Sequence, residues 1–439
     1  MKTVESDPST TSAVAKLRLP HPYLTTYYAV PAKQNDQTLK IQISGTYNGP
    51  HKELHRDDLS YLSLQEPAST AEDSNNSIWA RARRSYTTTV SWKGTPPTLS
   101  QLWLIVYMIF TQSPDHEYFR LSLNGDSKDE VTKHLKQSTL AIDHPRPSRE
   151  ADKHSKEGHD ELLVLRSTFW QGAASPFGQR SVWIPEGGGS ANVTTVDYTM
   201  TTKMPEFNQV HAWHPRRATK PAPGAVIYSR YIPTLDEHFS MQALDYENPE
   251  HLNLFHTWQN DPRVAAGWNE TGDLTHHKNY LRNLHEDPHV LTVLAYWDDT
   301  PFAYFEIYWA AEDHLGAHYQ ADGFDRGRHA LVGNPNFRGR HRVTAWWSAT
   351  MHYIFLDDPR TMRVVGEPKY VNTSVLAYDL MHGFGVQKFV DLGHKRSALM
   401  ICPRERYFQL GMDGTQEGVV GGTRVAVGIP KFTVIVAGP

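Results

Sequence analysis

The chain has 439 residues, more than one hydrophobic core usually serves, and this length predicts two domains. Its formal net charge is −4 at pH 7, which gives no broad basic surface and argues against nucleic acid as the main partner. The single cysteine, Cys402, allows no disulfide framework and predicts a reducing compartment.

The N-terminal half begins with a polar segment and continues with alternating strands and helices. Residues 1–16 are rich in Ser, Thr and Lys, so we expect them to be disordered, and no apolar signal-peptide segment follows them. Strands are predicted over residues 23–31, 38–44 and 85–94. A Pro-led amphipathic helix over 95–112 and a strand over 117–124 follow. Residues 126–160 are densely charged and predict an insertion or an exposed helix.

The best candidate for a domain boundary is HPRRATKPAPGAV, residues 214–226, because proline, glycine and basic residues interrupt the pattern there. We therefore expect an N-terminal domain with an insertion over residues 17–213, a linker over 214–226 and a second domain over 227–412. Residues 413–439 form a Gly/Val-rich tail that fits no predicted element.

The two halves repeat one order of elements. In the C-terminal half HALVG predicts a strand, NPNFRGR a loop, VTAWWSATMHYIF a helix and RVVGEP a strand. In the N-terminal half YTTTVSW, KGTPP, TLSQLWLIVYMIF and EYFRLSLN follow in the same order. Only the C-terminal loop carries Arg-Gly-Arg, so we predict two copies of one α+β fold with chemistry in the second copy alone.

The loop NPNFRGRHR is a candidate site for a pyrophosphate. The N-terminus of the helix that follows it has unpaired amides and a partial positive charge. Gly339 allows the backbone to approach an anion, and Arg338 and Arg340 can add charge-assisted hydrogen bonds. A basic turn that contacts nothing explains the loop equally well on this evidence alone.

The order of these elements resembles that of the GNAT acyltransferases, in which this loop holds the pyrophosphate of acyl-CoA. Asn372 and the pair Gly383-Phe384 match the beginning and end of the family's fourth helix. The loop departs from the usual Arg-Gly-x-Gly, since His341 stands at the second glycine position. The fold implied is a pair of tandem GNAT-like domains, each a mixed, mostly antiparallel sheet flanked by helices, with a degenerate N-terminal copy.

A more specific resemblance covers about residues 230–410. The segments TWQNDPRVAAGW, PFAYFEIYWAAEDHLG, FDRGRHALVG, FRGR, FLDDPRTMRVV and HKRSALM look like the siderophore hydroxamate acyltransferases. The branch includes the aerobactin and mycobactin enzymes and the fungal N5-hydroxyornithine transacylases. It implies acyl transfer from acyl-CoA to the side-chain hydroxylamine of N5-hydroxyornithine, with the anhydromevalonyl group favoured over acetyl. No tightly bound cofactor and no metal are implied.

His329 is the predicted general base, because a histidine can accept a proton near neutral pH. The resemblance pairs it with an acid in a Glu-Pro-Asp-type motif, which reads Glu367-Pro368-Lys369 here, so Glu367 is the candidate partner. The predicted substrate-binding residues are Trp268, Glu306, Tyr308, Trp309, Asp325 and Arg326. The predicted CoA-binding residues are Val332, Gly333, Asn334, Arg338, Gly339, Arg340, His341, Arg342 and Asn372.

The remaining residues of interest fit simpler roles. Trp346, Trp347 and Tyr353 follow helical spacing and are predicted to lie in the core, whereas His276 and His277 are predicted to lie at the surface. Alternative functions are an acetyl-CoA-dependent hydroxyornithine acetyltransferase, a GNAT scaffold without catalysis, and acetyl transfer to protein lysines. The expected compartment is the cytoplasm or the peroxisome, although the final Val-Ala-Gly-Pro is no peroxisomal signal. The sequence leaves open whether the protein forms a homodimer.

Overall fold

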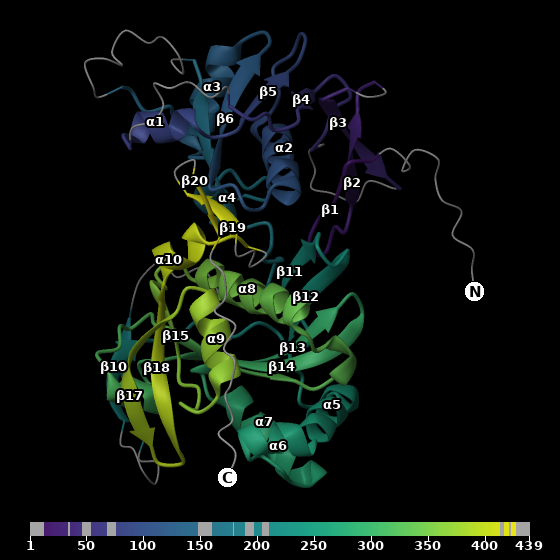
Figure 1. Cartoon of the computed structure of the whole chain (residues 1–439). Coiled ribbons are helices and arrows are strands. Elements are labelled where there is room, and N and C mark those ends of the chain that lie inside the picture. Colours follow the sequence, from purple (N-terminus) through teal and green to yellow (C-terminus); the bar gives the residue numbers. More distant parts are fainter. Residues whose placement is uncertain are drawn as a thin grey trace, which may run out of the picture.

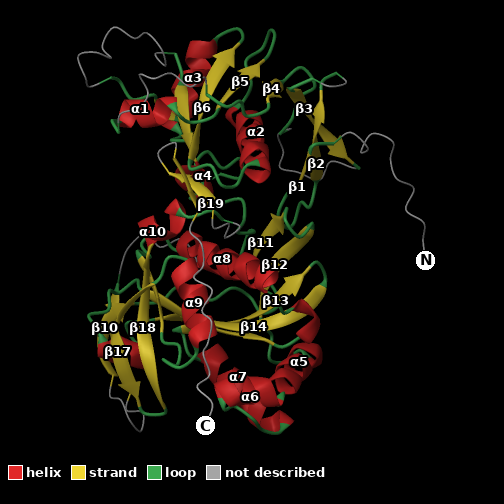
Figure 2. Ribbon diagram, viewed as in Figure 1, coloured by secondary structure: helices red, strands yellow, loops and turns green. Residues whose placement is uncertain are grey.

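The computed structural model describes residues 13–33, 36–45, 54–67, 76–147, 160–178, 180–188, 197–203, 210–412, 417–420 and 423–426. Two eight-stranded sheets, each flanked by helices, form the two halves of the chain (Figures 1 and 2). Among the described helices, none is both long enough and apolar enough to span a bilayer.

The first sheet has the strand order β1-β2-β3-β4-β5-β6-β8-β7, and only β5 and β6 pair in parallel among its described strands. The strands are β1 (Ala15–Arg18), β2 (Thr26–Pro31), β3 (Thr38–Ser44), β4 (Ser60–Leu62), β5 (Thr87–Ser91), β6 (Tyr118–Asn124), β7 (Ile142–Asp143) and β8 (Leu162–Leu165). The helices are α1 (Ile78–Arg83), α2 (Leu99–Gln112), α3 (Lys128–Gln137) and α4 (Arg166–Trp170).

The second sheet repeats this order as β11-β12-β13-β14-β15-β16-β18-β17, with one parallel pair, β15 and β16. Its strands are β11 (Val226–Ile232), β12 (Glu237–Ala243), β13 (Val290–Trp297), β14 (Thr300–Trp309), β15 (Arg326–Val332), β16 (Arg363–Gly366), β17 (Gly385–Leu392) and β18 (Lys395–Pro403). Its helices are α5 (Pro249–Gln259), α6 (Pro262–Trp268), α7 (Leu274–Glu286), α8 (Arg340–Asp357), α9 (Thr373–Met381) and α10 (Arg404–Gln409), with the 3₁₀ turns η4 (His314–His318) and η5 (Pro335–Phe337).

The repeated strand order confirms the prediction of tandem copies. The copies differ in the number of helices that accompany the sheet. The segment between β12 and β13 contains α5, α6 and α7, whereas β2 and β3 are separated only by residues 32–37. In the second copy, three additional helices therefore cover one end of the sheet. The N-terminal copy has no equivalent of these three helices in its described residues.

Two short hairpins lie outside the sheets. The first, β9 (Tyr198–Lys203) and β10 (Val210–Pro215), packs on the second domain, where Arg217 just beyond it forms a buried ion pair with Glu312. Lys203 of β9 also pairs with Asp287 at 2.8 Å, so contacts with the second domain begin before the predicted linker at 214–226. The second hairpin, β19 (Glu417–Val420) and β20 (Thr423–Ala426), lies in the predicted tail, and β1 begins at Ala15, inside the segment that we expected to be disordered.

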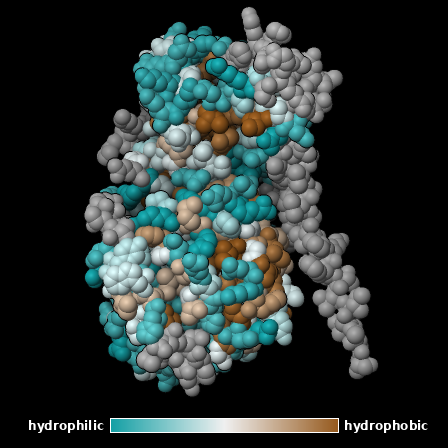
Figure 3. Space-filling view, turned by 90° about the vertical axis from the view of Figure 1, so that its left-hand side faces the viewer, coloured by the Kyte–Doolittle hydropathy of each residue, from teal (hydrophilic) through white to brown (hydrophobic). Residues whose placement is uncertain are grey.

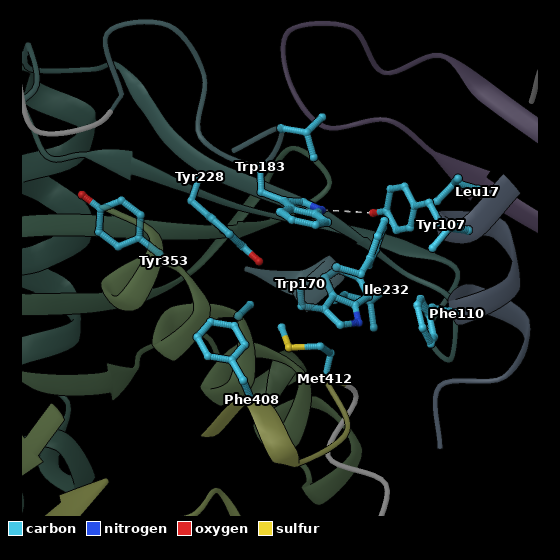
Figure 4. Packing of buried hydrophobic residues seen from close by; sticks show 14 of the residues in the cluster. Leu17, Tyr107, Phe110, Trp170, Trp183, Tyr228, Ile232, Tyr353, Phe408 and Met412 are labelled. Atoms are coloured by element: carbon cyan, nitrogen blue, oxygen red, sulfur yellow. Dashed lines mark hydrogen bonds between the residues drawn. The ribbon is translucent and has the colours of Figure 1, made fainter. Parts of the chain in front are cut away.

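The two domains share one hydrophobic core (Figure 4). Trp183 is fully buried, and its indole Nε1 donates to the Tyr107 hydroxyl at 3.2 Å across this core. Trp170 packs beside Trp183 with ring centroids 4.8 Å apart, and Nε2 of His352 on α8 donates to the carbonyl of Trp170 at 2.6 Å. This continuous packing fixes the N-terminal copy against α8.

The surface has no single large apolar face in the view of Figure 3, where hydrophobic areas in the upper and lower halves are separated by hydrophilic residues. The predicted core residues Trp346, Trp347 and Tyr353 are buried, which confirms that prediction. His276 is half exposed, but His277 is fully buried and bonds the carbonyl of Glu270, so the prediction of a surface position for His277 was wrong.

Candidate active site

Two adjacent strands bring the predicted base and an acid together. His329 is the fourth residue of β15, and its cross-strand partner on β14 is Glu306. Side chains alternate along a strand, so Tyr304, Glu306 and Tyr308 project from the same face of β14. The imidazole of His329 lies over this face, and its side chain is 30% exposed, which leaves it reachable from solvent.

The imidazole of His329 lies between two buried carboxylates. Its Nδ1 is 3.0 Å from Oε2 of Glu306, and its Nε2 is 2.7 Å from Oε1 of Glu367. Burial lowers the pKa of His329, but the carboxylates of Glu367 and Glu306 outweigh burial and raise the pKa to about 10. In the free protein at neutral pH, His329 is therefore an imidazolium that donates to both carboxylates.

Tyrosine hydroxyls hold the remaining oxygens of the two carboxylates. Tyr280 and Tyr304 donate to Oε1 of Glu306 at 2.8 and 2.9 Å, and Tyr308 donates to Oε2 of Glu367 at 2.8 Å. Burial and the adjacent carboxylates raise the pKa of all three tyrosines well above the ordinary value, so the hydroxyls remain protonated donors. The network is thus fixed in place before any substrate binds.

Glu367 occupies the place expected for the acid partner of His329. Burial would raise the pKa of Glu367, but His329 and Lys395 outweigh burial and hold it far below the ordinary value. Lys395 donates to the backbone carbonyl of Glu367 at 2.9 Å and to its Oε1 at 3.4 Å. Lys369, which stands where the motif usually has an aspartate, instead donates to the carbonyl of Ala266 at 3.3 Å.

The predicted substrate-binding residues divide into two groups. Glu306 and Tyr308 belong to the network, and Trp268 of α6 lies beside it, with its ring centroid 6.1 Å from that of His329 and 5.7 Å from that of Tyr304. Sequence reasoning missed Tyr280, Tyr304 and Lys395. The alternation along β14 pointed to Tyr304, and the HKRSALM segment contained Lys395.

Trp309 and Arg326 lie on the opposite face of the sheet, so their assignment to the substrate pocket is corrected. The guanidinium of Arg326 lies 4.3 Å from the ring centroid of Trp309 and forms a buried ion pair with Asp357 at 2.5 Å. Arg217 also lies 4.3 Å from the Trp309 ring. These are packing and charge-pairing roles within the fold.

Asp325 also serves the fold and does not reach the network. Its carboxylate accepts two hydrogen bonds from Arg363, at 2.9 and 2.7 Å, and one from the Tyr319 hydroxyl at 3.0 Å. With its hydrogen bonds satisfied and its side chain buried, Asp325 is positioned to join the start of β15 to β16.

Beyond these residues, β15 and β16 part. Their parallel pairing consists of Arg326 with Val364 and Gly327 with Val365, whereas the equivalent strands β5 and β6 pair over five positions. His329 lies just past the last pair. From Arg328 to Val332, which leads toward the N-terminus of α8, β15 therefore has no pair on β16, whereas the pairing of β5 with β6 continues.

The N-terminus of α8 is open. Gly339 precedes the helix with φ +132° and provides no side-chain cap, so amides of the first turn have no side-chain partner. In the N-terminal copy, Thr98 and Gln101 form a capping box at the start of the equivalent helix α2, in which each side chain accepts from the backbone amide of the other residue. The helix of the second copy therefore lacks the side-chain cap that the equivalent helix of the first copy has.

Two arginines converge on the loop before α8. Arg338 donates to the carbonyl of Gly333 at 3.3 Å, and Arg263 of α6 donates to the carbonyl of Val332 at 2.6 Å. Burial and the adjacent Arg338 lower the pKa of Arg263. Arg263 was missed because only the packing of α6 on the sheet brings it to this loop.

Other residues predicted to bind CoA serve the fold. Gly333 packs against Trp258, since a Cβ there would come 2.1 Å from the ring, and Asn334 caps η5. Arg342 pairs with Glu237, and Asn372 caps α9 through the amide of Val375 at 3.3 Å. The ring of exposed His341 lies beside Gly339. The side chain of Arg340 lies outside the described residues.

We expect Gly339→Asp to raise the KM for acyl-CoA about tenfold or more, equivalent to about 1.4 kcal/mol. The new carboxylate repels phosphates, and the Cβ comes 3.0 Å from His341 at a φ that L residues rarely adopt. Steady-state kinetics and calorimetry with CoA measure the effect. Gly339→Ala, which adds the same Cβ without charge, separates strain from repulsion. CoA affinity unchanged in Gly339→Asp would remove the loop from the CoA site.

Comparisons with known proteins match the chain to acyltransferases. The acetyltransferase (GNAT) domain model matches residues 247–392. The chain is 48% identical to the N(5)-hydroxyornithine:cis-anhydromevalonyl coenzyme A-N(5)-transacylase of Beauveria bassiana, over 95% of the chain and 96% of that protein. It is 47% identical to a putative O-acetyltransferase of Stachybotrys chartarum (94% and 95%) and 46% identical to the hydroxyornithine transacylase of Ajellomyces capsulatus (90% and 93%).

Proposed function

The chain belongs to the family of GNAT acyltransferases that includes the fungal N5-hydroxyornithine transacylases, and we propose that it transfers an acyl group from acyl-CoA to the side-chain hydroxylamine of N5-hydroxyornithine. The anhydromevalonyl group is the favoured acyl group, in the biosynthesis of a siderophore. The buried free thiol of Cys402 supports a reducing compartment, the cytoplasm or the peroxisome.

One observation carries the proposal: His329 lies between Glu306 and Glu367 at the point where β15 and β16 part. An acyl-CoA whose phosphates bind at the open N-terminus of α8 would extend along β15, so its thioester would reach His329. The nitrogen of an alkyl hydroxylamine is largely unprotonated at neutral pH and can attack the thioester carbonyl directly. The attack forms the N–C bond, and collapse of the tetrahedral intermediate breaks the C–S bond.

His329 is the proposed acceptor of the proton that the nitrogen loses. Neutral imidazole is the form that can accept it, and in this network the neutral form is an unusually strong base because two carboxylates stabilise the imidazolium. Glu306, held by Tyr280 and Tyr304, and Glu367, held by Tyr308, fix the position of the ring through its two nitrogens. The thiolate of CoA leaves and takes up a proton from solvent.

The direct test is mass spectrometry of the products formed from N5-hydroxyornithine and a panel of acyl-CoA thioesters, including anhydromevalonyl-CoA and acetyl-CoA. The proposal requires a mass increase equal to one acyl group with at least one donor. A second candidate is O-acyl transfer to the same acceptor, which the relative from Stachybotrys favours. Only the N-acyl product is a hydroxamate that forms a coloured ferric complex, so addition of Fe³⁺ distinguishes the two.

The raised pKa of His329 predicts the pH dependence. If neutral His329 is the active form, log kcat/KM rises with pH until the pKa of about 10 is reached, well above the ordinary 6.5. Glu367→Gln removes the negative charge that most raises this pKa, so the rising limb should move down by about 1–3 pH units. Kinetics with one donor and one acceptor between pH 6 and 10.5 measure the rising limb of wild type and that of Glu367→Gln. An identical limb in wild type and Glu367→Gln would contradict the assignment.

A further inference from the structure

A group of basic side chains lies next to the network, beyond Glu367. His314 comes from η4, which follows β14, and His394 comes from the turn between β17 and β18. Their ring centroids are 6.3 Å apart with an interplanar angle of 67°. Lys395, which follows His394 directly in the chain, donates to the carbonyl and to Oε1 of Glu367, so this turn lies beside that carboxylate.

His314 is held with one nitrogen free. Its Nδ1 is 3.2 Å from Oδ1 of Asp313, which also accepts from the amide of Leu315 at 2.9 Å. Burial lowers the pKa of His314, but the hydrogen bond to Asp313 outweighs burial and raises it, which favours the imidazolium. The Nε2 of His314 is buried and has no hydrogen-bond partner among the described residues. A buried donor without a partner is costly, so this nitrogen is available to a bound acceptor group.

The carboxylates beside the two histidines are already paired. Asp313 is neutralised by His314 and His289, which contacts its Oδ2 at 3.4 Å, and Glu367 is neutralised by His329 and Lys395. Burial lowers the pKa of His394, and the positive charges of Lys395 and His314 lower it further. A small anion between the two histidine rings would meet no unpaired carboxylate.

We propose that His314 and His394 form a subsite for the α-carboxylate of the acceptor amino acid. The inference rests on the proposed function, since N5-hydroxyornithine has a carboxylate on its Cα and three methylenes between Cα and the reacting nitrogen. With that nitrogen at His329, the proposal requires the carboxylate to lie on the side of Glu367 where the two histidines are found. The subsite selects free amino acids over hydroxylamines without a carboxylate.

The test compares two acceptors, N5-hydroxy-L-ornithine and N-hydroxyputrescine, which has the same hydroxylamine but no carboxylate. We expect His314→Gln and His394→Gln each to raise the KM for N5-hydroxyornithine about tenfold, with kcat and the KM for acyl-CoA little changed. The KM for N-hydroxyputrescine should stay as in wild type. His134→Gln, an exposed histidine on α3 of the other domain, is the matched control and should change neither acceptor.

An equal loss with both acceptors, or a rise in the KM for acyl-CoA alone, would overturn the subsite. Because His394 is exposed, its variant should fold even if His314→Gln lowers the melting temperature. If wild type acylates no hydroxylamine, the proposed function fails, and calorimetry then tests the subsite separately. Tighter binding of N5-hydroxyornithine than of N-hydroxyputrescine, with the difference lost in His314→Gln, would uphold it, and equal binding would refute it.

Discussion

Replacing His329 by alanine is expected to lower kcat by about 10²–10⁴, the usual loss when a general base is removed. The KM for acyl-CoA should change little, because the loop and helix amides proposed to bind the CoA phosphates lie beyond residue 333. His329→Gln should be nearly as damaging, since glutamine forms hydrogen bonds but cannot accept the proton. Kinetics at saturating acyl-CoA, normalised to folded protein, measure the effect.

Stability must be measured beside activity, because His329 is the cation between two buried carboxylates. Loss of one partner from a buried ion pair costs about 3–5 kcal/mol when the remaining charge has no compensation. Glu367 keeps Lys395 as a partner, so His329→Gln should fold and allow the comparison. If either variant keeps the full kcat per folded molecule and only melts earlier, His329 is structural, and the base must be sought elsewhere.

The sequence predicted the fold well because the repeat shows in the order and lengths of its elements. Strand, loop, helix and strand recur in both halves, and each set folds into the same strand order. The loop sequences also indicated how the copies differ at the N-terminus of this helix. Pro96-Pro97 precedes α2, which has the N-cap Thr98, whereas Gly339 precedes α8, which has no side-chain cap.

The candidate site was predicted only in part, because a resemblance in sequence does not separate catalytic residues from residues that build the fold. Arg326 and His329 stand three positions apart on β15, so they face opposite sides of the sheet. The face on which Glu367 lies could not be predicted, because its side chain could have pointed away from His329 if the strand had another register. Val365 pairs with Gly327, and the alternation along each strand therefore places Glu367 and His329 on the same face of the sheet.

Residues brought in by packing of distant elements could not be predicted. Tyr280 of α7 reaches Glu306, and Arg263 of α6 reaches the loop before α8, only because these helices cover one end of the second sheet. His314 and His394 are 80 positions apart in the sequence and meet through the β17–β18 turn. No local spacing encodes these contacts.

The other large effect is expected at the shared core of the two domains. Trp183→Ala should lower the free energy of unfolding by about 3–5 kcal/mol, the usual cost of removing a large buried aromatic side chain. The indole is fully buried, bonds Tyr107 of α2, and packs against Trp170 and against His352 of α8 with ring centroids 4.8 and 4.9 Å away. Its loss therefore leaves a cavity that both domains line.

Because the core is continuous, wild type should unfold in one calorimetric transition, and Trp183→Ala should lower the midpoint of the whole chain. Trp213→Ala is the matched control, since Trp213 is 65% exposed on β10 and should change the unfolding free energy by less than about 0.5 kcal/mol. The kcat of folded Trp183→Ala should match that of wild type, because Trp183 contacts neither His329 nor the loop before α8. Two separate transitions in wild type would show that the N-terminal copy folds independently of the catalytic domain.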